Sequence, residues 1–262
     1  MNLPADFDAA SMKSKHEVIA TLKHTPGAID KGYTMKYLRV DIGAGDIQVR
    51  DVTQEMVDLF IGGKGFDLRL MWDEVNGDTK WDSPENAICI ASGPLGGTTS
   101  FSGSGKSLVT SISPTTGAPI DSNVGGYFGP FLKFCGFDAL VVVGKAPEER
   151  ILIIDGARGE IRIEKAPDEA VDSHVLAEQL TAMYSDSRDD RDNVSVVSAG
   201  KGANHALIGC LNFSWFDWRR GGVRLKQAGR GGIGSVFRNK KIKAIVAHTS
   251  TWRPKWRVTV NS

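Results

Sequence analysis

The sequence predicts an α+β fold in which one β-rich unit occurs twice. An apolar strand, a glycine-containing turn and an alternating strand occupy residues 37–50, and the same order returns at residues 151–163. Helical spacing follows each hairpin, at residues 53–60 and 66–74 after the first and at residues 170–185 after the second. Because strands and helices do not alternate strictly, this pattern favours an internally duplicated α+β domain over a doubly wound sheet.

The two predicted units also share a glycine-rich loop followed by a β-branched run. Residues 125–129 precede the run at residues 139–143, and residues 231–234 precede the run at residues 244–247. Further short strands are expected at residues 87–91, 107–112 and 194–198. A glycine loop exposes backbone N–H groups to an anion, so a matched pair indicates one ligand with two anionic arms or two copies of one ligand.

Three regions are expected along the chain. Residues 1–34 are polar, contain one short helical pattern near residues 12–22, and are typical of an N-terminal arm. Residues 35–250 form the duplicated domain, whose halves meet near residues 145–150 and are expected to be related by a pseudo-twofold axis. Residues 251–262 form a tail that is basic and rich in tryptophan.

The composition is typical of a globular domain of ordinary size. The 262 residues are 41% hydrophobic, which is enough for one large core or two small ones. A formal net charge of +1 gives no reason to expect nucleic acid or an anionic membrane as the main partner. No apolar stretch approaches transmembrane length and the N-terminus lacks a secretory pattern, so we expect no membrane partner and a cytoplasmic location. The scattered cysteines Cys89, Cys135 and Cys210 fit that reducing compartment and are expected to be core residues.

Two nucleotide-binding motifs occur in the sequence, and we reject both. Residues 229–234 match GxGxxG, but a dinucleotide fingerprint must follow a strand, and the preceding residues 218–228 are polar. Residues 100–107 end in Gly-Lys-Ser like a P-loop, but Ser100 replaces the first required glycine, and a strand is expected next instead of a helix. Neither segment therefore predicts a nucleotide site.

Polar side chains flank the glycines in both predicted halves. The candidate site consists of Lys106, Asn123, Gly125, Gly126, Lys226, Gln227, Gly229, Arg230 and Gly231. This spacing brings cations and amides beside loops whose backbone allows a ligand to approach closely, as phosphate binding requires. The local pattern leaves a second interpretation equally open, in which the glycines only form turns and the cations are solvated.

Six motifs stand in a fixed order along the chain. They are SPEN at residues 83–86, ASGPL at 91–95, SPTTG at 113–117, NVGGYFG at 123–129, LKFCGFDA at 132–139 and AGRGGIG at 228–234. In order and spacing they resemble the N-terminal domain of the aldehyde:ferredoxin oxidoreductases, tungsten enzymes with a bis-pterin cofactor. The resemblance runs from about residue 35 to about residue 249, and it implies a duplicated α+β unit that forms the base on which two pterins lie.

The resemblance implies a role for several candidate residues. Lys106 lies where the family has an arginine at the pterin phosphate, a change that keeps the charge but loses the bidentate contact. Asn123 and Gly125 match the loop that meets the cofactor, where the family's asparagine helps to hold a Mg²⁺ ion bridging the two pterin phosphates. Lys226 and Gln227 lie where the family usually has Arg-Ala, and Gln227 preserves the metal contact if that contact is a backbone carbonyl.

The resemblance also implies parts that are expected on another chain. Family enzymes continue into domains that carry four cluster-binding cysteines and the groups near tungsten, whereas this sequence ends at Ser262 and its cysteines match none of those ligands. A [4Fe-4S] cluster is therefore expected only on a second polypeptide that also carries the catalytic domains, with a ferredoxin-type carrier as an indirect partner and a homodimer as a further option. His174, His205 and His248 are isolated in the sequence and are expected to be structural or exposed, so no catalytic residue is assigned.

Three functional classes follow from the resemblance. The first is the cofactor-binding subunit of a split oxidoreductase with a tungsten, or molybdenum, bis-pterin centre that acts on aldehydes or activated carboxylic acids. The second is a non-catalytic module that binds pterin or assists its assembly. The third is a truncated remnant that keeps the fold without the cofactor, which the altered Lys106 and Gln227 favour slightly. Replacing Lys106 or Lys226 by Glu should distinguish a chain that binds the cofactor from a remnant that only keeps the fold. Lys240, expected on the surface, is the control position.

Overall fold

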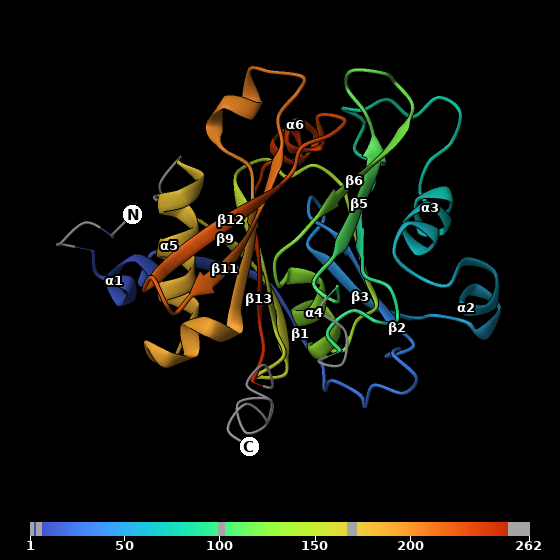
Figure 1. Cartoon of the computed structure of the whole chain (residues 1–262). Coiled ribbons are helices and arrows are strands. Elements are labelled where there is room, and N and C mark those ends of the chain that lie inside the picture. Colours follow the sequence, from blue (N-terminus) through green and yellow to red (C-terminus); the bar gives the residue numbers. More distant parts are fainter. Residues whose placement is uncertain (1–2, 4–6, 99–102, 167–171, 251–262) are drawn as a thin grey trace.

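The computed structural model describes residues 3, 7–98, 103–166 and 172–250, and it confirms the α+β class (Figure 1). Two mixed β-sheets, one of six and one of seven strands, carry the two halves of the chain. No helix in the described ranges combines the length and the hydropathy needed to cross a membrane. The tryptophan-rich tail at residues 251–262 lies outside the described residues, and the boundaries expected for the arm and the tail stay predictions.

The first half forms the six-stranded sheet, whose strand order is β3-β2-β7-β4-β5-β6. Its elements in chain order are β2 (Lys36–Asp41), β3 (Asp46–Asp51), α2 (Gln54–Phe60), α3 (Lys64–Trp72), β4 (Ile88–Ala91), β5 (Ser107–Ile112), β6 (Pro119–Val124), α4 (Phe128–Phe134) and β7 (Ala139–Val143). The β2–β3 hairpin is antiparallel, and β7 returns to pair in parallel with β2. The hairpin, the two helices after it and strands β4, β5 and β7 are therefore present as the sequence predicts.

The second half repeats this strand order as β9-β8-β13-β10-β11-β12. Its elements in chain order are β8 (Arg150–Asp155), β9 (Glu160–Lys165), α5 (Ser173–Tyr184), the 3-10 turn η1 (Asp189–Asn193), β10 (Val194–Ser198), the 3-10 turn η2 (Lys201–Asn204), β11 (Leu211–Asp217), β12 (Gly222–Ala228), α6 (Ile233–Asn239) and β13 (Ile242–His248). Here β13 returns to pair in parallel with β8, as β7 does with β2. The expected equivalence of the two β-branched runs, now β7 and β13, is confirmed by their places in the strand orders.

The helices α4 and α6 form a layer between the two sheets, and the other helices cover the outer faces (Figure 1). The central core joins inward-facing residues of both sheets to Phe128, Phe131 and Phe237 from these two helices. Helices α2 and α3 pack on the outer face of the first sheet, and α5 packs on the outer face of the second. Contacts of β1 with β3 and of β6 with β12 bring the sheet edges together. The two halves therefore share one core.

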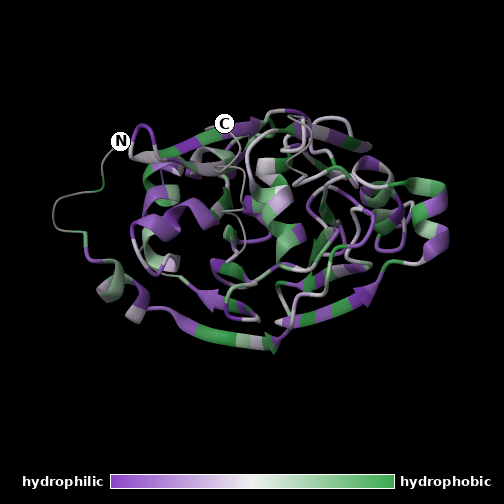
Figure 2. Cartoon of the chain, turned by 60° about the horizontal axis from the view of Figure 1, so that its bottom comes forward, coloured by the Kyte–Doolittle hydropathy of each residue, from purple (hydrophilic) through white to green (hydrophobic). Residues whose placement is uncertain are grey.

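The helical pattern predicted near residues 12–22 is wrong over its second part. The helix α1 (Ala9–Ser14), capped by the carboxylate of Asp8, is followed by β1 (Glu17–Lys23), which pairs antiparallel with β9 as the seventh strand of the second sheet. Figure 2 shows the underside of the molecule, where the chain continues from α1 into this edge strand. The β9 edge offers unpaired backbone groups, and pairing with them outweighs the weak helical preference of the β-branched residues at positions 18, 19 and 21.

The polar residues 218–228 were not expected to form a strand, but they contain β12. The GxGxxG segment at residues 229–234 therefore follows a strand and opens α6, so the reason given above for rejecting a dinucleotide site is wrong. The rejection holds for a topological reason: β12 is an edge strand separated from β13 by β11 and β10, and each neighbouring pair is antiparallel. β12, α6 and β13 therefore form no parallel βαβ unit. The P-loop-like segment leads into β5 as expected, and residues 99–102 lie outside the described residues.

Lys240, expected on the surface, is buried where α6 meets the first half. Only 1% of the residue is exposed, and its Nζ donates to the carbonyl oxygens of Pro84, at 2.9 Å, and Gly144, at 3.0 Å. Burial lowers the pKa of Lys240 to about 7. Local sequence does not show which end of a helix faces another part of the chain. A glutamate at this position would place a buried carboxylate beside two carbonyl oxygens and would destabilise the fold. Lys240 therefore cannot serve as a surface control.

We expect Phe237→Ala to destabilise both halves together by about 3–5 kcal/mol, because the ring lies in the core that the two sheets share. Thermal unfolding should remain one transition at a lower Tm. Hydrogen exchange should accelerate in β2 and β7 as well as in β8 and β13. As a control, Leu207→Ala, at a half-exposed position, should change the free energy of unfolding by less than about 0.5 kcal/mol. Loss of protection confined to the second half would show that the halves have separate cores.

Candidate functional site

The edges of β6 and β12 lie side by side where the two halves meet (Figure 1). On one side of this junction the backbone N–H of Arg230 donates to Oγ of Ser122 at 3.1 Å. On the other side a Cβ built on Gly125 would lie 3.8 Å from Cγ of Lys226. The numbering rises along one edge as it falls along the other, so the two edges run in opposite directions. We call the surface along this junction the β6–β12 seam.

All nine predicted site residues lie along the seam. The loop before β5 joins it, since a Cβ on Gly105 would lie 3.0 Å from the carbonyl oxygen of Gly126. The exposed side chains of the seam are Lys106, Asn123, Lys226, Gln227 and Arg230. The glycines beside them are Gly125, Gly126, Gly229 and Gly231. Three loops that are distant in the sequence are therefore neighbours in the fold, which their doubled pattern predicted; Ser102, expected in the first of them, lies outside the described residues.

Asn123 and Gln227 occupy equivalent positions in the two halves. Each is the next-to-last residue of its strand, β6 or β12, and each is exposed. Both lie between the two cross-contacts described above, which places them near the centre of the seam. The Nε2 of Gln227 donates to Oδ1 of Asn212 at 3.3 Å, and this leaves the side-chain oxygen of Gln227 as an acceptor.

Gly125 and Gly229 are required neither by the backbone conformation nor by packing within the protein. Each directly follows its strand, and neither has a φ angle in the left-handed region. A Cβ on Gly229 would meet no atom within 4 Å, and one on Gly125 would make only an ordinary contact. Gly231, by contrast, has a φ of 70°, and its Cβ would lie 2.3 Å from Ile120. Gly231 therefore serves the fold, whereas Gly125 and Gly229 leave open space on the seam.

Two further residues of the seam escaped the sequence analysis. Lys64, the first residue of α3, pairs with Asp121 of β6 at 2.7 Å. The ring of Trp215 lies beneath Lys226, whose Nζ is 5.6 Å from the ring centroid. Lys64 directly follows the Gly-Gly pair at residues 62–63, and the other loops of the seam also combine glycines with a cation. This shared pattern could have indicated Lys64. Nothing in the local sequence indicates Trp215, because its approach to Lys226 depends on the pairing of β11 with β12.

The chain is similar to a known family over most of its length. A family model described as the N-terminal domain of aldehyde ferredoxin oxidoreductase matches residues 37–249. The chain belongs to this family. The matched region contains the whole β6–β12 seam and both sheets apart from β1 and the first residue of β2, so the recognition made from the six ordered motifs is confirmed.

Curated relatives of this aldehyde ferredoxin oxidoreductase domain include larger tungsten proteins. The tungsten-containing aldehyde ferredoxin oxidoreductase of Pyrococcus furiosus is 32% identical, over 84% of this chain and 34% of the relative. That of Pyrococcus horikoshii is 34% identical, over 82% of this chain and 33% of the relative. The WOR-like subunit of an aliphatic sulfonate oxidoreductase from Pyrococcus furiosus is 24% identical, over 83% of this chain and 35% of the relative. The chain spans about a third of the length of the curated relatives it matches.

A solved structure shares the fold of the domain. A chain of the BamBC active-site complex of benzoyl coenzyme A reductase, solved with 1,5-dienoyl-CoA, has a TM-score of 0.69 and 28% sequence identity to this chain. The similarity covers 83% of this chain and 31% of that chain. The α+β architecture is therefore also that of a subunit chain in a larger assembly.

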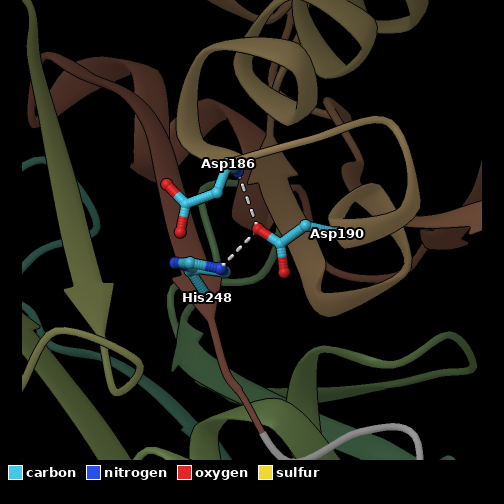
Figure 3. A group of neighbouring side chains, drawn as sticks. All are labelled: Asp186, Asp190 and His248. Atoms are coloured by element: carbon cyan, nitrogen blue, oxygen red, sulfur yellow. Dashed lines mark hydrogen bonds and ion pairs between the residues drawn. The ribbon is translucent and has the colours of Figure 1, made fainter.

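The last strand of the aldehyde ferredoxin oxidoreductase domain ends in a charged cluster (Figure 3). The ring of His248 is buried between Asp155, whose Oδ1 is 3.0 Å from Nδ1, and Asp190, whose Oδ2 is 2.9 Å from Nε2. Arg158 donates to Asp155 at 2.7 Å and also pairs with Asp186. His248 is therefore structural, as expected, and its partners come from β8 and the 3-10 turn η1, which approach it only in the fold. His174 and His205 are exposed, as expected.

This cluster is interpreted as an ion-paired lock and not as a metal site. A metal could also suit this spacing, because three potential ligand atoms lie within 4.8 Å of one another, one each from Asp186, Asp190 and His248. However, Arg158 and protonated His248 already supply two positive charges to the carboxylates. Burial alone would lower the pKa of His248, but hydrogen bonds and attraction to Asp155 and Asp190 raise that pKa to about 9. The lock fixes the end of β13 to β8 and η1.

The lock predicts a defined dependence of stability on pH. The pKa of His248 is about 9 in the fold and 6.5 in an ordinary environment, so its stabilisation is complete below about pH 6.5 and is lost as the pH rises through 9. Despite burial, contacts with His248 and Arg158 lower the pKa of Asp155 from 3.8 to about 2, so its contribution is lost as the pH falls from about 4 to 2. We expect wild type to exceed His248→Gln in free energy of unfolding by up to about 3 kcal/mol near pH 6, and by much less at pH 10.

Urea unfolding of both proteins across this pH range would measure the difference directly. The comparison with the variant matters, because other buried groups, Lys240 among them, also titrate between pH 7 and 10. A difference between the two proteins that stays constant from pH 6 to pH 10 would contradict the lock.

Proposed function

We propose that the β6–β12 seam binds the phosphate groups of a tungsten bis-pterin cofactor, and that this chain is the cofactor-binding part of an oxidoreductase of the family. The proposal depends above all on the equivalent loops at Gly125 and Gly229, which meet at one junction and keep open space that the fold itself does not require. A ligand with two phosphate-bearing arms would use both loops, one from each half.

The charges on the seam fit such an anionic ligand. Lys106, Lys226 and Arg230 are exposed, and none of them forms an ion pair with a carboxylate in the described ranges. Phosphate oxygens accept hydrogen bonds from ammonium and guanidinium groups and from the backbone N–H groups of glycine loops. The surplus of positive charge along the seam therefore supports phosphate binding over the alternative in which the glycines only form turns.

Asn123 and Gln227 would hold a Mg²⁺ ion that bridges the two phosphates. Mg²⁺ prefers hard oxygen ligands and is commonly held by a few protein oxygens together with phosphates and water. Amide and backbone carbonyl oxygens of these two residues satisfy that requirement. Their equivalent positions near the centre of the seam support one shared ion.

When bound, the tungsten–pterin centre would supply two-electron redox chemistry on aldehydes or activated carboxylic acids. Tungsten is favoured over molybdenum by the relatives, which are named as tungsten-containing. The role of this chain would be to bind the cofactor and to fix its orientation. A second polypeptide would carry the [4Fe-4S] cluster and the catalytic domains and would pass electrons to a ferredoxin-type carrier. The similar fold of a chain in the BamBC complex supports such a partner, and a cytoplasmic location fits the buried free thiols of Cys89 and Cys135.

Charge reversal on the seam tests this function. We expect Lys106→Glu and Lys226→Glu each to weaken cofactor retention by a factor of about ten or more, because a carboxylate would then face a phosphate. The measurement is the tungsten and pterin content of the protein purified with its co-eluting partners, with thermal melting followed in parallel. Both lysines are exposed, so the variants should still fold.

The matched control is Lys80→Glu, an exposed lysine in the loop between α3 and β4, which should leave the cofactor content unchanged. Unchanged cofactor content in both seam variants would contradict the proposal and would favour a remnant that keeps the fold alone. Retention of pterin by a chain that co-purifies with no second polypeptide would favour a pterin-binding or assembly module.

A further inference from the structure

The inner helix α4 contains a buried lysine among apolar neighbours. Lys133, the next-to-last residue of α4, is 2% exposed, and Phe131 and Leu132 beside it belong to the central core. Burial lowers the pKa of Lys133 to about 8, and attraction to Asp138 partly opposes this effect. No carboxylate forms an ion pair with Lys133 in the part of the chain that the structure describes. An apolar side chain here would avoid the cost of burying a cation, so the ammonium group is expected to hold something in place.

The ammonium group of Lys133 joins two segments that are distant in the sequence. Its Nζ donates to the carbonyl oxygen of Gly93, in the loop between β4 and β5, at 2.7 Å. It also donates to the carbonyl oxygen of Gly32, in the arm before β2, at 2.7 Å. The two segments touch each other as well, because a Cβ on Gly32 would lie 2.3 Å from the carbonyl oxygen of Pro94. Lys133 therefore fixes the start of the β4–β5 loop against the arm.

The start of this loop is bonded to the segment that carries Lys106. The carbonyl oxygen of Gly93 also accepts the backbone N–H of Gly96 at 2.9 Å, which closes a turn. The N–H of the next residue, Gly97, donates to the carbonyl oxygen of Ser104 at 3.0 Å. Ser104 is two residues before Lys106, the cation that this loop contributes to the β6–β12 seam. Hydrogen bonds thus lead from the buried ammonium group to the backbone beside Lys106.

The second half contains the same arrangement. Arg238 is the next-to-last residue of α6, as Lys133 is of α4, and it is 7% exposed. Its Nε donates to Oδ1 of Asn204 at 3.2 Å, in the loop between β10 and β11, which is the counterpart of the β4–β5 loop. Its guanidinium group also pairs with Glu149, directly before β8. In each half, a buried cation of the inner helix therefore ties the corresponding loop to the segment before the first strand of the hairpin.

We propose that Lys133 is a positioning residue for the cofactor site, holding the β4–β5 loop so that Lys106 lies on the seam. This inference rests on the proposed binding of phosphate at the seam, and it adds a residue that does not itself touch the ligand. A lysine on a loose loop loses conformational entropy when it meets a phosphate, and a loop that is fixed in advance reduces that loss. Lys133 should therefore act on cofactor retention through Lys106.

Hydrogen exchange of the full chain without cofactor tests the contact itself. Lys133→Met nearly keeps the side-chain volume and removes the buried charge, and the Gly93 carbonyl keeps its bond from Gly96, so the variant should fold. Exchange should accelerate about tenfold or more in residues 93–97 and 103–106, with little change in β2 and β7. Lys133→Gln, which keeps an N–H donor, should show the same pattern with a smaller increase. Unchanged exchange in both variants would overturn the inference.

Two other buried cations supply matched controls. Arg238→Met removes the equivalent contact of the second half, and it should release residues 201–204 while residues 93–97 stay protected. Lys240→Met also removes a buried ammonium group that bridges two carbonyl oxygens, but neither carbonyl belongs to the β4–β5 loop. This variant should leave both loops protected. Release of residues 93–97 by either control would indicate a general loosening of the fold and would overturn the inference.

A double-mutant cycle tests whether Lys133 acts through Lys106. The measurement is the rate at which tungsten leaves the purified complex during dialysis, for wild type, Lys106→Ala, Lys133→Met and the double variant. Each single change should raise this rate about fivefold or more. The double change should raise it no further than the larger single effect, because both changes remove the same contact.

The outcomes of this cycle separate the inference from the proposed function. If Lys106→Ala raises the rate but Lys133→Met does not, or if the two effects multiply, the positioning role is overturned and phosphate binding at the seam stands. If Lys106→Ala leaves the rate unchanged, the proposed function itself is contradicted, and the role of Lys133 in cofactor retention fails with it.

Discussion

The packing of α4 and α6 between the two sheets is the constraint on which the rest of the structure depends. Both sheets are apolar on both faces. Along β7, for example, Leu140 and Val142 belong to the central core, whereas Val141 and Val143 face the cluster beneath α2 and α3. Each sheet therefore needs a cover on both sides, and the inner helices cover two sheets at once. Neither half could bury its inner face alone, which is the physical reason that the duplicated units form one domain.

The β6–β12 seam is a consequence of that shared core. Each inner helix is entered from the strand at the edge of its own sheet, β6 or β12. Sharing the helices brings these two edges together, and with them the glycine loops that connect strand to helix. Residues at equivalent positions, such as Asn123 and Gln227, then reach the same surface. The proposed site for a ligand with two arms would thus arise from repetition of one unit, without any long-range motif in the sequence.

The two halves differ most at their outer layers. The second half has gained β1 at its sheet edge, α1 over α5, and the ion-paired lock of His248 at the end of its last strand. The first half has none of these within the described residues, and its outer helices keep apolar side chains such as Trp72 in contact with solvent. Equivalent strands therefore have different surroundings in the two halves.

The sequence by itself determined the fold class, the duplication, most strands and nine residues of the seam. Those features depend on local alternation, glycine turns and ordered motifs, which are written into short segments. Only the tertiary structure decided the pairing of β1 with β9, the burial of Lys240, the contact of Lys226 with Trp215 and the partners of His248. In each case an edge strand, a helix end or a carboxylate from a distant segment supplies the interaction. No local pattern carries that information, because the free energy of these contacts depends on which segments the shared core brings together.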